Sequence, residues 1–214
     1  MGVLKVLLAL YLLVNLKSLP LMYHVRFYYF MVKHFYIHRK NKPRSVFEVQ
    51  NYATRAPFME TDFNLHKSNS TYFIDLDMSR TNLLMHVFKD FFLKYKDSEV
   101  PDAGWPYCPV ASVASVFRKE LSPYELYNVK SRVLGWDQKW LFVVSRFEKF
   151  DKKSTLCAVC LTKYVFKMKR KTVPPATVIK FCNLNSQEAM EEGQKGFELA
   201  KAFLEIEALE EKSF

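Results

Sequence analysis

The stretch from Thr61 to Phe73 constrains the fold of this chain more than any other. It reads Thr-Asp-Phe-Asn-Leu-His-Lys-Ser-Asn-Ser-Thr-Tyr-Phe, and it places a carboxylate, Asp62, four residues before an imidazole, His66. An apolar pattern with helical spacing follows directly and continues to Tyr95. We therefore expect this polar cluster to lie where a long buried helix begins. Polar residues from Met78 to Asn82 predict a break within that helix.

The start of such a helix has free N–H groups and partial positive charge, which suit a developing oxyanion or a bound phosphate. Two interpretations of the cluster are open. In one, Ser68, Asn69 or Ser70 only caps a core helix, while Asp62 and His66 close a loop. In the other, the same residues carry out chemistry.

A family resemblance favours the chemical interpretation. Asp62, His66, Asn69 and Tyr72 fit a motif of Asp, His, Asn and an aromatic residue that opens a helix after the first strand. In this the chain resembles the 4-hydroxybenzoyl-CoA thioesterase-like branch of the hotdog superfamily. The resemblance implies thioester hydrolysis in which Asp62 is the base or nucleophile, His66 orients the loop or the carboxylate, and N–H groups near Asn69 to Thr71 hold the oxyanion.

A second resemblance covers the run from Val110 to Phe147. That run looks like the membrane-anchored proteins called thioesterase superfamily member six, which also have an apolar N-terminal segment and a basic linker. The resemblance implies an acyl-CoA thioester substrate, with coenzyme A held by basic residues at a homodimer interface. The candidate residues, for which ordinary charged strand faces are the alternative, are Arg118, Lys119, Lys130 and Arg132.

The chain departs from the thioesterase pattern at two positions. Leu65 stands where the pattern has Gly before the His, and Lys67 precedes Ser68-Asn69 where the pattern has paired Asn. Glycine would take a positive φ or let the backbone approach a thioester closely. The departures support a second hypothesis, a catalytically inactive hotdog protein that binds acyl chains or a partner protein at the membrane.

The pattern beyond the motif predicts an α+β domain over residues 46–180. We expect one strand within Val46 to Phe58, then, after a loop from Asp97 to Pro109, four more strands that form an antiparallel sheet wrapped around the long helix. Their predicted bounds are Val110–Lys119, Tyr124–Leu134, Trp140–Phe150 and Thr155–Met168.

An acidic helix is predicted over residues 181–214. Asn185 or Ser186 caps it, and its glutamates form a solvated face. Gly193 and Gly196 are expected to weaken it by about 1 kcal/mol each relative to Ala.

The N-terminus predicts a membrane anchor. Val6 to Leu16 is apolar except for Asn15, and Lys5 and Lys17 bound it. If both lysines reach opposite headgroup layers, a helix from Val3 to Tyr23 spans a bilayer. We therefore expect a membrane helix over residues 1–23 and an interfacial, basic linker over 24–45. A cleaved signal peptide and a helix lying in the membrane interface are the alternatives.

The distribution of charged residues predicts on which side of the membrane the domain lies. The net charge is +10, and residues 1–47 hold eight Lys and Arg but no Asp or Glu. Positive flanks stay in the cytosol, so the domain is expected there, on the endoplasmic reticulum membrane or, alternatively, in the secretory pathway or on a mitochondrial membrane. The basic aromatic stretch accompanies no nucleic-acid motif, and we expect no nucleic-acid partner.

The four cysteines are expected to be reduced thiols. Cys157 and Cys160 form a Cys-x-x-Cys pair within a predicted strand, where positions i and i+3 point to opposite faces. No second pair completes a zinc site. We expect no metal and no cofactor.

Overall fold

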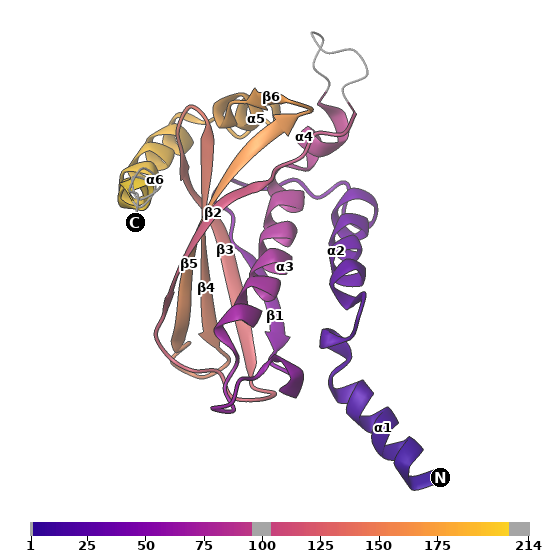
Figure 1. Ribbon diagram of the computed structural model, residues 1–214. Helices are drawn as coiled ribbons and strands as arrows, with labels where there is room; N and C mark the ends of the chain where they lie inside the picture. The colour runs from indigo at the N-terminus through magenta and orange to yellow at the C-terminus, as the bar shows by residue number, and fades with distance from the viewer. Residues whose placement is uncertain (1, 96–103, 206–214) are drawn as a thin grey trace.

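The computed structural model describes residues 2–95 and 104–205, and it has one antiparallel sheet that curves around a long helix (Figure 1). The order of the five main strands is β1-β3-β4-β5-β2, and a short sixth strand pairs with β5. The strands are β1 (Gln50–Arg55), β2 (Val110–Phe117), β3 (Leu126–Trp136), β4 (Trp140–Lys149), β5 (Leu156–Met168) and β6 (Lys171–Val173).

Six α-helices accompany the sheet in the described residues. Figure 1 shows α3 along one face of the sheet, α2 beside α3 on the side away from the sheet, and α6 at the opposite side. The helices are α1 (Gly2–Val14), α2 (Met22–Val32), α3 (Asn69–Val87), α4 (Lys89–Lys94), α5 (Pro175–Phe181) and α6 (Gln187–Glu205). Three shorter helical segments are η1 (Leu16–Ser18), η2 (Lys33–Ile37) and η3 (Phe58–Glu60).

The alternation of side chains between the two sides of each strand determines which face of the sheet packs on α3. In β3, Tyr127, Val129 and Val133 are fully buried in the core around α3, whereas Leu134 packs with Phe142 under α6. Successive strand residues point to opposite faces, so both faces of β3 are covered where α6 lies. The predicted antiparallel sheet wrapped on one helix is confirmed. The predicted loop from Asp97 to Pro109 lies partly outside the described residues.

The predicted break between Met78 and Asn82 is wrong. Helix α3 runs without interruption to Val87, and the turn before α4 falls at Phe88. The polar residues do not disturb the helix because their side chains bond to the sheet. Ser79 Oγ donates to the Val129 carbonyl of β3 at 3.0 Å, and Asn82 Nδ2 donates to the Asn51 carbonyl of β1 at 3.3 Å.

The first helix is shorter than predicted. It ends at Val14, because Asn15 is fully buried and connects the chain to the domain. Asn15 Nδ2 donates to the Tyr11 carbonyl at 2.9 Å, and Asn15 Oδ1 accepts from the Met59 N–H at 3.0 Å. The prediction of one helix from Val3 to Tyr23 is therefore wrong. Nowhere in residues 2–95 and 104–205 is a helix both long enough and apolar enough to cross a membrane.

We define the N-terminal arm as residues 2–37. The part of the arm that follows α1 packs along the domain. Phe30 and Phe35 pack in a buried cluster with Met78 and Met85 of α3. Helix α1 differs from this docked part, since none of its residues is buried and it projects away from the sheet (Figure 1).

The C-terminal part contains two elements that the sequence did not predict, β6 and α5. Helix α6 begins as expected, with Ser186 Oγ accepting from the Ala189 N–H at 3.2 Å. Its glycines have a packing role, because a Cβ on Gly196 would lie 1.6 Å from the Leu134 carbonyl oxygen. Gly193 likewise faces the Trp136 ring. These glycines allow α6 to lie directly on β3.

Candidate functional site

A closed loop holds Asp62 and His66. The Asp62 N–H donates to the His66 carbonyl at 2.9 Å, and a bridge between Thr61 and Lys67 closes the base of the loop. The Leu65 N–H donates back to the Asp62 carbonyl at 3.0 Å. Leu65 has a φ of 58°, the left-handed conformation that glycine takes readily. Leucine therefore keeps the turn that the thioesterase pattern assigns to glycine.

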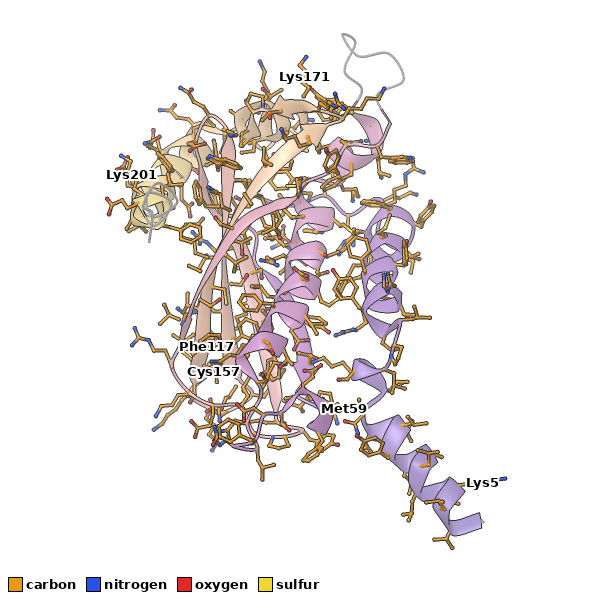
Figure 2. The ribbon with its side chains drawn as sticks, viewed as in Figure 1. Lys5, Met59, Phe117, Cys157, Lys171 and Lys201 are labelled. Carbon is orange, nitrogen blue, oxygen red and sulfur yellow. The ribbon has the colours of Figure 1, made fainter. Side chains whose placement is uncertain are left out.

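A second segment, residues 118–121, lies against this loop. It follows β2, and the Arg118 N–H donates to the Cys157 carbonyl of β5 at 2.7 Å. The Lys67 N–H donates to the Leu121 carbonyl at 2.8 Å, which ties the loop to this segment. Figure 2 shows Phe117 and Cys157 at the end of the sheet where α3 begins.

The two segments and the first turn of α3 line a cavity of about 230 Å³ that is open to solvent, which we call the loop cavity. It brings together three predicted catalytic residues and two predicted coenzyme A ligands. Its lining is Asp62, His66, Lys67, Asn69, Tyr72, Phe117, Arg118, Lys119 and Glu120. Sequence reasoning did not assign Glu120 to the site, and no motif marks it.

Asp62 is half-buried at this cavity. Its Oδ1 accepts one hydrogen bond, from the Asn64 N–H at 2.9 Å, which orients the carboxylate within the loop. A carboxylate that is oriented but accessible to water can act as a general base or as a nucleophile. His66 is half-buried beside it, and its carbonyl holds the Asp62 backbone.

The N-terminus of α3 supplies the expected N–H donors in part. Ser68 is the N-cap residue and makes no side-chain cap hydrogen bond. The Thr71 N–H donates to the Ser68 carbonyl at 2.9 Å and is already used. The candidate donors for an oxyanion are therefore the N–H groups of Asn69 and Ser70, in a helix long enough to have a dipole of full strength at its end.

Lys130 and Arg132 do not line the loop cavity. Both lie on β3, where Lys130 Nζ pairs with Glu148 at 2.7 Å and Arg132 pairs with Glu192 of α6 at 2.9 Å. The Arg132 guanidinium also lies over the Phe47 ring, 5.5 Å from its centroid. The structure therefore separates these two residues from Arg118 and Lys119.

A buried cluster of charges lies behind the cavity. The side chain of Lys67 is fully buried, and its Nζ is 2.5 Å from Glu60 Oε2 and 2.9 Å from Asp75 Oδ2. Lys17 of the N-terminal arm pairs with the same two carboxylates, at 2.9 Å and 2.8 Å. Tyr127 donates its hydroxyl to Asp75. This cluster joins the arm, the loop, α3 and β3.

Asp75 stays ionised in this cluster. Burial alone would raise its pKa, but Lys17 and Lys67 and the hydrogen bonds from Lys17 and Tyr127 hold that pKa below its usual value. The sequence did not predict this cluster, since Lys17 was expected at a membrane surface and Lys67 only as a departure from the motif. The weak signal was the position of Asp75 among the apolar residues of α3.

Tyr72 forms an apolar wall of the cavity. Its ring contacts Phe117 edge-on, with the ring centroids 5.1 Å apart, and Phe147 at 4.9 Å. Burial raises the pKa of the Tyr72 hydroxyl, so the side chain stays neutral. Lys67 Nζ lies over the same ring, 5.4 Å from its centroid.

The described residues contain no cluster of three or more His, Cys, Asp or Glu side chains that would hold a metal ion. All four cysteines are free. Cys157 and Cys160 are buried in β5. The polar groups at the loop cavity include the carboxylates of Asp62 and Glu120, the His66 imidazole, the N–H groups at the start of α3, and the cations Lys67, Arg118 and Lys119.

Comparison with known proteins assigns the chain to a family. Residues 56–181, more than half of the chain, match the model of the Thioesterase-like superfamily. The chain therefore belongs to this superfamily, and its fold is the hotdog fold of that family. The match includes the Asp62 loop, α3 and the strands from β2 to β6.

Relatives with thioesterase names extend the match toward the N-terminus. The chain is 39% identical to the "Probable thioesterase YBR096W" of Saccharomyces cerevisiae over 193 residues, which cover 84% of this chain and 80% of that protein. It is 33% identical to "Thioesterase poxG" of Penicillium oxalicum over 225 residues, which cover 86% of this chain and 73% of that protein.

Solved structures support the fold. A hypothetical protein, TT1821 from Thermus thermophilus, aligns with a TM-score of 0.50 at 20% identity and covers 65% of this chain and 100% of its own. Slr0204, a 1,4-dihydroxy-2-naphthoyl-CoA thioesterase from Synechocystis, aligns with a TM-score of 0.50 at 11% identity and covers 66% and 98%. At these identities the likeness concerns the fold alone.

Proposed function

We propose that this protein is an acyl-CoA thioesterase in which Asp62 is the base or the nucleophile. The observation that carries the proposal is the loop cavity, which gathers Asp62, His66 and Asn69 beside Arg118 and Lys119. Family membership supports the reaction type.

In the proposed reaction, Asp62 removes a proton from water, which attacks the thioester carbonyl carbon. Alternatively, the carboxylate attacks first, and water then hydrolyses the mixed anhydride. The carbonyl oxygen becomes an oxyanion that accepts hydrogen bonds from the N–H groups of Asn69 and Ser70. The carbon–sulfur bond breaks, the thiolate takes a proton, and a carboxylic acid leaves.

Arg118 and Lys119 are proposed to bind the phosphates of coenzyme A. Both are exposed at the cavity, where charge-assisted hydrogen bonds to phosphate are accessible from solvent. Lys130 and Arg132 were predicted for the same role, but their ion pairs with Glu148 and Glu192 engage them elsewhere. We assign the coenzyme A role to the first pair.

The test is hydrolysis of a series of acyl-CoA thioesters by the full-length chain. Arg118→Ala with Lys119→Ala is expected to raise KM at least about tenfold with little change in kcat, because phosphate binding is equal in the ground state and transition state. Lys130→Ala with Arg132→Ala is the matched control and should leave KM unchanged. Equal effects in the two double variants would contradict the assignment.

The inactive alternative, a hotdog protein that only binds acyl chains or a partner, rested on Leu65 and Lys67. The positive φ of Leu65 weakens that argument, since the turn is kept. Absence of hydrolysis for every thioester in the series, with acyl-CoA binding retained, would favour the inactive alternative.

Helix α1 is proposed to lie in a membrane interface. Its support is an exposed and almost wholly apolar surface that includes Leu7, Leu10 and Leu13. Apolar burial of this kind holds interfacial helices on bilayers. The full-length chain should sediment with phosphatidylcholine vesicles containing phosphatidylserine, and Leu7→Glu with Leu10→Glu should release it. Sedimentation that is unchanged in that variant would contradict the proposal.

The domain is proposed to face the cytosol, on the endoplasmic reticulum membrane. The support is the basic N-terminal region without carboxylates, because the cytosolic leaflet carries the anionic lipids that attract such segments. Asn69-Ser70-Thr71 is a consensus glycosylation site with Asn69 exposed, so it reports on the lumen. Release of a glycan from Asn69 by endoglycosidase would contradict a cytosolic domain.

A homodimer is also proposed. Strand β2 is at one edge of the sheet, where it pairs with β5 on one side, and Val116 on it is 51% exposed. Edge pairing with a second copy would cover β2 and place Arg118 near the seam. Light scattering should give the mass of a dimer, and a stable monomer at micromolar concentration would contradict this assembly.

A further inference from the structure

A second and larger cavity lies where the N-terminal arm meets the domain. Its volume is about 500 Å³, against about 230 Å³ for the loop cavity. Phe27 and Met31 line it from α2, and Thr81, Leu84 and Met85 line it from α3. We call it the arm groove. The arm side of the groove lies outside residues 56–181, the part that matches the family model.

The arm groove is elongated. Its lining on α2 runs from Tyr23 to Met31, and its lining on α3 runs from Asp77 to Met85. Each of these stretches extends about 12 Å along its helix, at about 1.5 Å per residue. Two helices side by side over that length form a channel. Its shape suits an extended, chain-like ligand better than a compact, ring-like one.

The walls of the groove are preformed. Phe35, Met85 and Tyr164, all in its lining, are buried by packing within the protein itself. The mouth carries aromatic residues that face solvent, with Trp105 74% exposed and Tyr107 47% exposed. Largely preformed apolar cavities of this size, lined by aromatic and aliphatic groups, are typical of small-ligand sites.

The charges around the groove select against an ionic occupant. Asp77 is the one charged residue in the described lining, and it is already paired with Arg80. It also accepts a hydrogen bond from the Tyr23 hydroxyl at 3.3 Å. Since no lysine or arginine lines the described groove, an anionic head group would have no partner within it. The described lining therefore favours an occupant that is uncharged along the part that lies inside.

The arm groove is separate from the loop cavity. The two linings share no residue, and Asn69 and Asp77 are about 12 Å apart along α3. At β2, Val110 lines the groove, whereas Phe117 at the other end of the strand lines the loop cavity. A ligand can thus occupy the groove without touching Asp62.

We propose that the arm groove binds one long, uncharged alkyl chain, of the kind found in fatty acyl compounds. The chain lies parallel to α2 and α3, between Met31 on one side and Leu84 on the other. Its binding holds the arm against the domain, because both sides of the groove contact it. This site does not depend on hydrolysis at the loop cavity.

The test measures binding of dodecyl maltoside to the full-length chain, below the concentration at which this probe forms micelles. Calorimetry should give saturable binding of one probe per chain, and the fluorescence of Trp105 should shift, since this residue lies at the mouth. Trp105→Phe identifies that signal. Maltose, the head group alone, should not bind. Asp62→Asn should bind the probe as the wild type does.

Two variants and one matched control decide the location. Met31→Glu places a charge in the groove, and Thr81→Phe fills it without a charge; each should weaken binding at least tenfold. Met190→Glu makes the same change on an exposed face of α6, where Met190 is 41% exposed, and should leave binding unchanged. No saturable binding in the wild type, including the case in which a second copy of the chain covers the groove, would overturn the proposal. Equal weakening in Met31→Glu and Met190→Glu would overturn it too.

Discussion

Lys17 and Asp75 are separated by 58 residues in the sequence, and their charged groups lie 2.8 Å apart. The pair joins the N-terminal arm to the central helix, at a place where Asp75 is fully buried. Glu60 and Lys67 complete the same cluster, and Lys67 also lines the loop cavity. The arm is thereby connected to the loop that carries Asp62.

Removal of the Lys17 charge should destabilise the protein. Lys17→Ala leaves Glu60 with Lys67, and Asp75 with Lys67 and the more distant Arg26 at 3.5 Å. We expect a loss of about 1.5–3 kcal/mol in unfolding free energy, the usual value of hydrogen bonds to charged groups. Urea unfolding measures the loss. Lys5→Ala, a change on the exposed helix α1, is the control. Equal stability of the two variants would mean that the arm does not dock in solution.

Leu65→Gly should stabilise the protein. A residue with a side chain pays roughly 1–2 kcal/mol for the left-handed conformation that Leu65 takes at a φ of 58°. Glycine avoids most of that cost, so we expect an increase of about 1 kcal/mol in unfolding free energy. Phe63→Gly is the matched control, because Phe63 is 92% exposed in the same loop and does not have a positive φ. A gain in both variants would argue against the conformation described for Leu65.

Gly196→Ala should destabilise the protein, although alanine favours helices by about 1 kcal/mol over glycine. The added Cβ would lie 1.6 Å from the Leu134 carbonyl oxygen, so α6 must move away from β3. We expect a loss of at least about 1–3 kcal/mol, the range for overpacked sites, in thermal or urea unfolding. Lys195→Ala, on the exposed face of α6, should be nearly neutral. Stabilisation by Gly196→Ala would show that α6 does not lie on β3.

Stability should fall as the pH is lowered from about 6.5 toward 4. Burial lowers the pKa of His34 to about 4, against an unfolded value of roughly 6.5. In that pH window the unfolded chain binds more protons than the folded one, so acid favours unfolding. His34→Gln, which retains a donor for Asn82 Oδ1, should reduce the slope of melting temperature against pH. His24→Gln, at an exposed position, should not; an unchanged slope in His34→Gln would contradict the burial of this imidazole.

The local pattern of apolar and polar residues was sufficient to predict the sheet and the loop that holds Asp62 and His66. Alternation in β3 and β4 gave their positions to within a few residues, and the apolar spacing after Phe73 gave α3. The spacing could not show that Ser79 and Asn82 bond to strands, so it predicted a break where the helix continues. Asp62, His66 and Asn69 are close in sequence, and their proximity in space follows from one loop and one helix start.

Long-range contacts could not be predicted in the same way. A lysine that ends an apolar run resembles a membrane boundary, and only the positions of Glu60 and Asp75 show that Lys17 is an ion-pair partner. Lys130 and Arg132 resemble Arg118 and Lys119 in sequence, since all four are cations in predicted strands. Their separation follows from the acidic partners Glu148 and Glu192, which lie far away along the chain.

The most direct test of the central claim is the pair of measurements, kcat and melting temperature, on Asp62→Asn. Asparagine keeps an oxygen that accepts the Asn64 N–H, now 2.9 Å from Asp62 Oδ1, so the loop should persist. The charge is lost, and kcat for acyl-CoA hydrolysis is expected to fall at least about 100-fold, the scale of positioned base catalysis, with little change in melting temperature. Unchanged turnover together with a lowered melting temperature would contradict the account and make Asp62 a structural residue of the loop.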